Sequence, residues 1–197
     1  MRRPILKRLF AYIVDLIIVV VIASLFIDMP ILNPYFDKYL ELSESLVSYL
    51  NGGEVLTQEA INNLQYEFVY YSFYSSIILI SIKILYFILF QYINKGKTIG
   101  KAIFKIELVS EKRKLKFYQV LLSSLIICNI FTQSITLVLL RTLSKSSFMS
   151  ISGYISTIEL TIAMITVVMI TMRKDARGLH DLISNTSVVY RKEEKND

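Results

Sequence analysis

Three ionisable side chains interrupt long apolar stretches of this sequence: Asp15, Lys83 and Glu159. A charge near the centre of a membrane helix costs roughly 2.5–3.5 kcal/mol on insertion scales, so such a side chain faces other helices or water and has a partner. A carboxylate in this setting can bind and release a proton or a sodium ion, and a nearby lysine can act as a tethered competing cation. These residues are therefore the first candidates for chemistry.

Two interpretations of the three charges remain open. In the first, they serve assembly: the helices pack polar stripes inward, and Lys83 neutralises Asp15 or Glu159. In the second, they line a route for a cation, a proton or a small solute. Transport predicts that the three side chains converge on a polar cavity, whereas assembly predicts a closed bundle with paired charges.

The apolar stretches that carry these charges are long enough to cross a bilayer, because about 20 apolar residues span its hydrocarbon core. Four segments of the 197-residue chain qualify, at about residues 9–27, 69–93, 117–140 and 151–172. We therefore expect an all-α membrane protein whose four-transmembrane-helix bundle forms one domain over residues 1–190, with a charged tail at 191–197. The first segment is too long for a signal-peptide core, and we interpret it as a retained helix.

The distribution of charge predicts an orientation. The net charge is +6, but basic residues concentrate at the N-terminus and in the connection 94–116, whereas the connection 28–68 carries one lysine and seven acids. Lys and Arg are enriched in cytoplasmic segments next to membrane helices. We therefore expect both termini and 94–116 in the cytoplasm, where the basic loop would meet anionic lipid headgroups of the bilayer. This pattern argues against nucleic acid as a partner.

The outer connection 28–68 has the features of a helical hairpin. Apolar residues recur near helical spacing on both sides of Asn51-Gly52-Gly53, which would break the helix, and Thr57 is a suitable N-cap for the second helix.

The cytoplasmic connection has a β-strand pattern instead. Alternating and β-branched residues from Ala102 to Ser110 are followed by the charged Glu111–Lys114 and by Leu115–Phe117. This order predicts a small β-hairpin, to which Thr186–Tyr190 would add a third strand.

Neither polar motif of the cytoplasmic side indicates an enzyme. The run Gly96–Lys101 lacks the spacing of a P-loop, so we interpret it as a tight turn at the membrane face, with its lysines near lipid headgroups. His180-Asp181 is the only His–acid pair, and no second His or recognisable nucleophile accompanies it. We expect no catalytic residue, no metal site and no cofactor.

Three segments of the sequence resemble the RDD family of bacterial membrane proteins, which is named for one arginine and two aspartates. The stretch from Arg8 to Asp15 is similar to the family's R…A…D opening. Gly96-Lys97-Thr98-Ile99-Gly100-Lys101 resembles its Gly-x-Thr-x-Gly-Lys turn, and Arg177–Val189 resembles its closing R-x-L-x-D-x-x-x-x-T-x-V-V segment.

The resemblance implies which residues matter. It assigns the second aspartate to Asp181, with Asp175 as the alternative, and it places Asn185 where the family more often has glycine. We expect Asp181 to pair with Arg8 and to pin the C-terminal segment beneath the bundle. The complete set of expected site residues is Arg8, Asp15, Lys83, Glu159 and Asp181, with Gly96, Thr98, Gly100 and Lys101 in the cytoplasmic turn.

The resemblance also implies a role in transport, because Na⁺(Li⁺)/H⁺ antiport has been ascribed to some members of the family. The leading expectation is thus a small transport protein of the bacterial cell membrane, for a cation and protons or for a small solute. Four short helices leave little room for a complete pathway, so we expect a homo-oligomer. The alternative is a non-transporting accessory or scaffold protein, which would bind a partner protein or lipid through its outer or inner loop.

Overall fold

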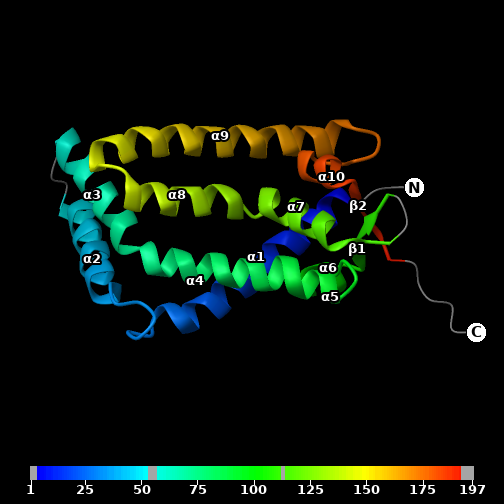
Figure 1. The fold of residues 1–197 in the computed structure, drawn as a ribbon, viewed down its shortest axis with the longest axis horizontal. Coiled ribbons are helices and arrows are strands. Elements are labelled where there is room, and N and C mark those ends of the chain that lie inside the picture. Colours follow the sequence, from blue (N-terminus) through cyan, green and yellow to red (C-terminus); the bar gives the residue numbers. More distant parts are fainter. Residues whose placement is uncertain (1–3, 53–56, 112–113, 192–197) are drawn as a thin grey trace, which may run out of the picture.

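The computed structural model describes residues 4–52, 57–111 and 114–191. Long helices run side by side along its long axis, and shorter elements gather at the two ends (Figure 1). Within the described residues, three helices are long and apolar enough to cross a membrane, or four if one bent pair of helices is a single span. Both chain termini lie at the same end (Figure 1).

The first two spans pack against each other. Helix α1 runs over Ile5–Ile27, and it buries one face made of Ala11, Asp15, Val19 and Ala23. Residues four apart share a helix face, and small residues on that face let a neighbouring helix approach closely. The second span, Phe73–Ile93, is one continuous helix. It consists of α4 (Phe73–Lys83), the π-helical stretch η1 (Ile84–Phe90) and α5 (Gln91–Ile93).

The segment expected to form one helix over 117–140 is broken in the middle. Helix α7 (Phe117–Ile127) ends before Cys128, and α8 (Ile130–Thr142) begins after Asn129, with a bend of 64° between the two. Asn129 has a left-handed backbone with φ of 53°. Asn adopts this conformation more readily than most residues, so the break has a local cause.

Helix α9 (Lys145–Met172) begins six residues before the start expected at 151. The side-chain oxygen of Ser144 accepts a hydrogen bond from the backbone N–H of Ser147, which caps the helix nearly two turns earlier than the hydrophobicity indicates. Phe148 is its buried residue. The helix lies along α7 and α8 at the edge of the bundle (Figure 1).

The helical hairpin expected for 28–68 is present at the end opposite the termini (Figure 1). It consists of α2 (Phe36–Gly52) and α3 (Gln58–Tyr71), and the Thr57 side chain caps α3 as expected. Residues 53–56 of the connection between them lie outside the described residues. A cluster of tyrosine rings in stacked and edge-to-face contact holds the hairpin to the start of the second span: Tyr35, Tyr66, Tyr70, Tyr71 and Tyr74.

The β-element joins two distant segments. Strand β1 (Ile106–Ser110) pairs antiparallel with β2 (Thr186–Tyr190), so that Ile106 lies opposite Tyr190. The local hairpin expected within 94–116 is wrong, because Leu115–Phe117 leads into α7 and the backbone N–H of Lys116 donates to the Gln119 side chain. Residues 112–113 of the expected turn and 192–197 of the expected tail lie outside the described residues.

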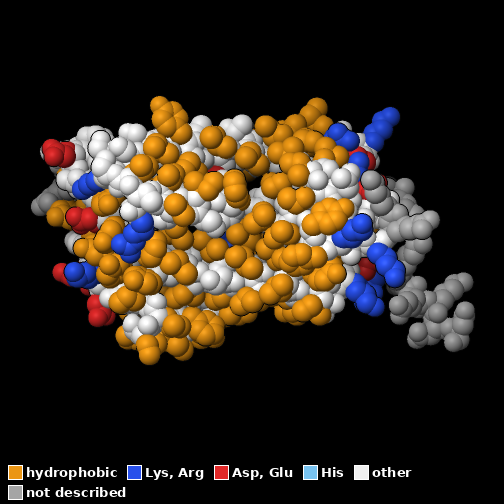
Figure 2. Space-filling model, viewed as in Figure 1, with side chains coloured by type: hydrophobic (Ala, Val, Ile, Leu, Met, Phe, Trp, Pro, Cys, Tyr) orange, Lys and Arg blue, Asp and Glu red, His pale blue; other side chains and the backbone are white. Residues whose placement is uncertain are grey.

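Two short helices complete the end that carries the termini. Helix α6 (Ile99–Ile103) precedes β1, and α10 (Leu179–Ser184) precedes β2. Hydrophobic side chains cover the middle of the visible face, and Lys and Arg gather at this end (Figure 2). An apolar belt between polar ends is the surface that a bilayer-spanning bundle requires.

Candidate functional site

The carboxylate of Asp15 lies where α1, η1 and α6 meet. Its exposed fraction is 1%. It accepts hydrogen bonds from the Tyr86 hydroxyl at 2.6 Å, the Gly100 N–H at 2.7 Å and the Thr98 hydroxyl at 2.5 Å. Hydrogen bonds to a charged carboxylate are the strong ones, so these three donors stabilise a negative charge inside the protein.

The Gly96–Lys101 turn places the start of α6 against the Asp15 carboxylate. Thr98 caps α6, and a Cβ on Gly100 would lie 2.2 Å from the Ala11 carbonyl oxygen and 2.8 Å from Asp15 Oδ1. Gly96 has φ of +88°, and a Cβ there would lie 2.1 Å from the Leu108 carbonyl oxygen. Both glycines are therefore required, one by the approach of α6 to α1 and the other by the approach of β1 to the turn.

The structure brings Arg8 and Asp181 together from opposite ends of the chain. Asp181 is fully buried, and its Oδ2 accepts hydrogen bonds from Arg8 and, at 3.1 Å, from the N–H of Gly178 at the start of α10. Arg8 also donates to the Ala176 carbonyl at 2.6 Å. These contacts fasten α10 to the first helix, which is the geometry expected for this pair.

His180 lies beside the same ion pair. Its Nε2 is 3.4 Å from an Arg8 nitrogen and 3.3 Å from Asp181 Oδ1. Burial lowers the pKa of His180 to about 4, although the Asp181 carboxylate opposes the shift, so the ring is neutral at neutral pH. Within residues 4–52, 57–111 and 114–191, no hydrogen-bond partner is present for His180 Nδ1 or Asp181 Oδ1.

A small cavity lies between these groups, and we call it the polar chamber. It has a volume of about 60 Å³, room for roughly two water molecules or a small ion. Its ionisable lining residues are Arg8, Asp15, Lys101, His180 and Asp181. Two of these residues carry the buried atoms without partners, and such atoms are what a bound water or ion would satisfy.

Lys101 does not extend toward lipid headgroups, as the sequence suggested, but lines the polar chamber. No hydrogen bond or ion pair to its ammonium is present in the described part of the chain. Burial lowers the pKa of Lys101 to about 8, although Asp15 opposes the shift. The side chain therefore gains and loses its proton close to neutral pH.

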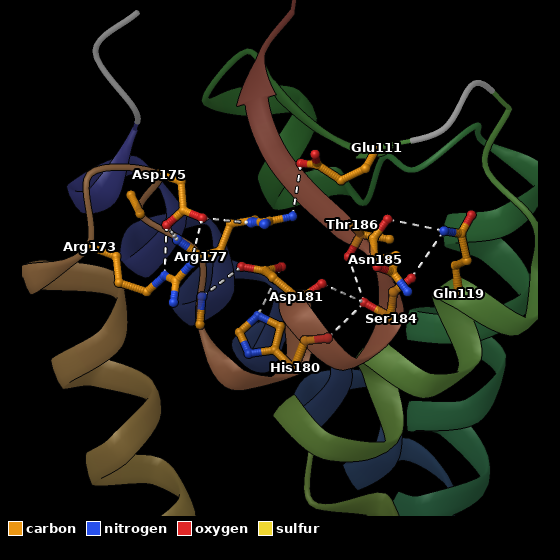
Figure 3. Close-up of polar contacts among 12 residues, drawn as sticks. Glu111, Gln119, Arg173, Asp175, Arg177, His180, Asp181, Ser184, Asn185 and Thr186 are labelled. Carbon is orange, nitrogen blue, oxygen red and sulfur yellow. Dashed lines mark hydrogen bonds and ion pairs between the residues drawn. The ribbon is translucent and has the colours of Figure 1, made fainter.

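Asp175 belongs to a separate network outside the polar chamber. Figure 3 shows it between Arg173 and Arg177, at 2.9 Å and 3.0 Å from their Nε atoms. Arg177 also lies 3.1 Å from Glu111. The Arg173 guanidinium holds the pKa of Asp175 below its usual range. Of the two candidate aspartates, the geometry therefore favours Asp181 as the one that acts with Arg8.

Lys83 lies at the break between α7 and α8. Its ammonium donates to Gln133 Oε1 at 2.9 Å and to the Cys128 carbonyl at 3.3 Å. Among the residues that the structure describes it makes no ion pair with Asp15 or Glu159. Glu159 still interacts electrostatically with the ammonium, so any neutralisation of Glu159 by Lys83 acts at a distance and not by direct contact. A helix end leaves backbone carbonyls free, and these carbonyls satisfy an ammonium without a carboxylate.

Glu159 occupies a third position. Its carboxylate accepts a hydrogen bond from the Thr132 hydroxyl and lines a pocket beside α9 that shares no lining residue with the polar chamber. Asp15, Lys83 and Glu159 thus face the interior of the bundle but do not converge on one cavity.

Residues that sequence reasoning missed complete the site. Tyr86 donates to Asp15, and Gln119, 2% exposed, donates to the carbonyls of Ser184 and Asn185 at 3.0 and 3.1 Å, which ties α7 to α10 (Figure 3). A tyrosine in an apolar helix is a usable signal, because its hydroxyl needs a partner when buried. Asn185 has φ of 52°, which explains why glycine also suits this position.

Comparison with known families gives one result. The model of the RDD family matches residues 2–185, which is most of the chain. The protein therefore belongs to the RDD family, and it has apolar helices of membrane-spanning length. Comparisons with curated proteins and with solved structures give no match.

Proposed function

We propose that this protein exchanges a monovalent cation for protons across a bacterial cell membrane and that the polar chamber is its ion site. One observation carries the proposal: two buried carboxylates and Lys101, whose pKa is lowered by burial to about 8, line one small cavity. Transport through a meeting point of Asp15, Lys83 and Glu159 has no such support.

The charges of the polar chamber suggest how exchange would work. With Lys101 protonated, two positive groups, Arg8 and Lys101, balance the carboxylates of Asp15 and Asp181. Loss of the Lys101 proton leaves a net negative charge in a low-dielectric site, which favours entry of a cation. Return of the proton expels the cation again. One proton is thus exchanged for one cation, with Asp181 Oδ1 as a free oxygen ligand.

The surroundings complete the proposal. The basic end, which carries both termini, lies in the cytoplasm, where its lysines and arginines meet anionic lipid headgroups. A single copy has few helices from which to build a pathway, so the protein works as a homo-oligomer.

A second candidate function is a membrane accessory or scaffold protein without transport. The three hydrogen bonds at Asp15 favour this function, because a carboxylate that only joins helices is satisfied by donors within the chain. In that case the polar chamber holds only water, and the protein binds a partner or lipid through its outer or inner loop.

Ion flux in vesicles separates the two functions. Purified protein in vesicles is given a sodium gradient, and proton movement is followed with a trapped pH indicator. We expect exchange that rises as the pH passes about 8, where Lys101 loses its proton. Asp15→Asn should lower the rate at least tenfold, and Lys101→Met should remove its dependence on pH in this range.

Glu159→Gln is the matched control, because Glu159 lies in the membrane helices but outside the polar chamber. It should leave exchange within about twofold of the wild type. Absence of exchange by folded wild-type protein would support the accessory function, and full exchange by Asp15→Asn would remove the polar chamber from the mechanism.

A further inference from the structure

A second pocket lies at the break between α7 and α8, where α9 passes alongside. Its volume is about 260 Å³, close to the lower end of the usual range for small-molecule sites. Most of its wall is apolar, from residues of all three helices such as Leu122, Phe131 and Ile162, and three polar residues face it: Asn129, Thr132 and Glu159. This apolar pocket is large enough for a ligand with one ring.

Within the described ranges Glu159 makes no ion pair, and Lys83 acts on its charge only from a distance. Its one hydrogen bond comes from the Thr132 hydroxyl, and the ammonium of Lys83 is engaged by Gln133 and by the Cys128 carbonyl. A carboxylate in apolar surroundings must bind either a proton or a cation, because desolvation of an unpaired charge costs several kcal/mol.

The hydrogen bond from Thr132 does not satisfy this carboxylate fully. The same hydroxyl is 3.1 Å from the carbonyl oxygen of Asn129, and a hydroxyl has only one proton to donate. The backbone of Asn129 competes with Glu159 for it. A ligand that brings its own positive charge would relieve this competition.

We propose that this pocket binds a small amphipathic organic cation, an amine or quaternary ammonium with a hydrocarbon body. The positive group would lie against Glu159, and the body would pack on the leucine, isoleucine and phenylalanine side chains. A bare metal ion fits less well, because the wall offers it few oxygen ligands. The site is independent of the exchange proposed for the polar chamber.

Binding of benzyltrimethylammonium tests the proposal, because its neutral isostere neopentylbenzene has the same shape without the charge. Scintillation proximity with the tritiated cation on purified full-length protein in detergent should show saturable binding. Glu159→Gln should weaken binding at least tenfold. The neutral isostere should compete at least tenfold less well than the unlabelled cation.

Two controls keep the result interpretable. Asp15→Asn should bind the cation as the wild type does, which separates this site from the polar chamber, and circular dichroism should show that Glu159→Gln is folded. The proposal fails if wild-type protein shows no saturable binding, if Glu159→Gln binds equally well, or if the neutral isostere competes equally.

Discussion

Asp15 and Glu159 are both carboxylates in apolar helices, yet their surroundings are opposite. Asp15 accepts three hydrogen bonds and is 1% exposed, and it lies among basic groups at the end of the bundle that carries the termini. Glu159 is half-buried, accepts one shared hydrogen bond and lies against hydrocarbon side chains. The first carboxylate finds several hydrogen-bond donors within the chain, whereas the second finds one that it shares.

The difference comes from how closely the neighbouring elements approach. Around Asp15, Ala11 and Gly100 allow α1 and α6 to touch, so the backbone N–H of Gly100 reaches the carboxylate. Helix α9 buries only Phe148 closely, and the break after α7 leaves a hollow beside Glu159. Close packing therefore supplies polar partners, and loose packing leaves an open pocket.

The largest effect is expected from removing the carboxylate that holds Arg8. Asp181→Asn leaves a guanidinium in a buried site without a counter-charge, and losing one partner of a buried pair costs about 3–5 kcal/mol. Unfolding in detergent with increasing denaturant measures this loss. Asp175→Asn is the control, because its network lies at the surface and should change stability little. If both variants lost the same free energy of unfolding, the Arg8–Asp181 contact would stabilise the protein no more than the surface network does.

A smaller loss of stability is expected when the glycine next to Asp15 gains a methyl group. In Gly100→Ala the new Cβ meets the Ala11 carbonyl and Asp15, so α6 must move away, at a cost of about 2–3 kcal/mol. Gly153→Ala on α9 is the matched control, because nothing lies within 4 Å of its Cβ position. The control should be neutral or stabilising by about 0.5–1 kcal/mol. Similar unfolding midpoints for the two variants would contradict the conclusion that Gly100 is closely packed and Gly153 is not.

The smallest effect is expected from mild acid. Burial lowers the pKa of His180 from 6.5 to about 4, so between these values the unfolded chain binds more protons than the folded one, and stability falls as the pH falls. From about pH 7 to about pH 5.5 the loss is about 1 kcal/mol. His180 is the only histidine, so His180→Asn should flatten the dependence of the unfolding midpoint on pH. If the unfolding midpoint of His180→Asn depended on pH as steeply as that of the wild type, another group would cause the loss of stability in acid.

Much of this fold could be predicted from local features of the sequence. Long apolar runs predict membrane helices, Thr57 predicts a helix start, and the motif residues predict the family. Arg8, Asp15 and Asp181 are among the expected site residues and line the polar chamber, whereas Lys101 was expected at lipid headgroups. Two local signals could also have been used: Ser144 as the cap of α9 and Asn129 as a helix break. Hydrophobicity alone does not show them, because it predicts one continuous helix for each apolar run.

The sequence by itself determined which segments are apolar enough to cross a membrane and which charges cannot face lipid, because hydrophobicity and charge are properties of each segment. The family resemblance also predicted that Arg8 meets Asp181. Only the tertiary structure decided that Asp15 meets the turn at Gly100 and that Lys83 meets a broken helix end. It also decided that β1 pairs with β2. These contacts join residues far apart in the chain, so they depend on how the helices pack, and no local pattern specifies that packing.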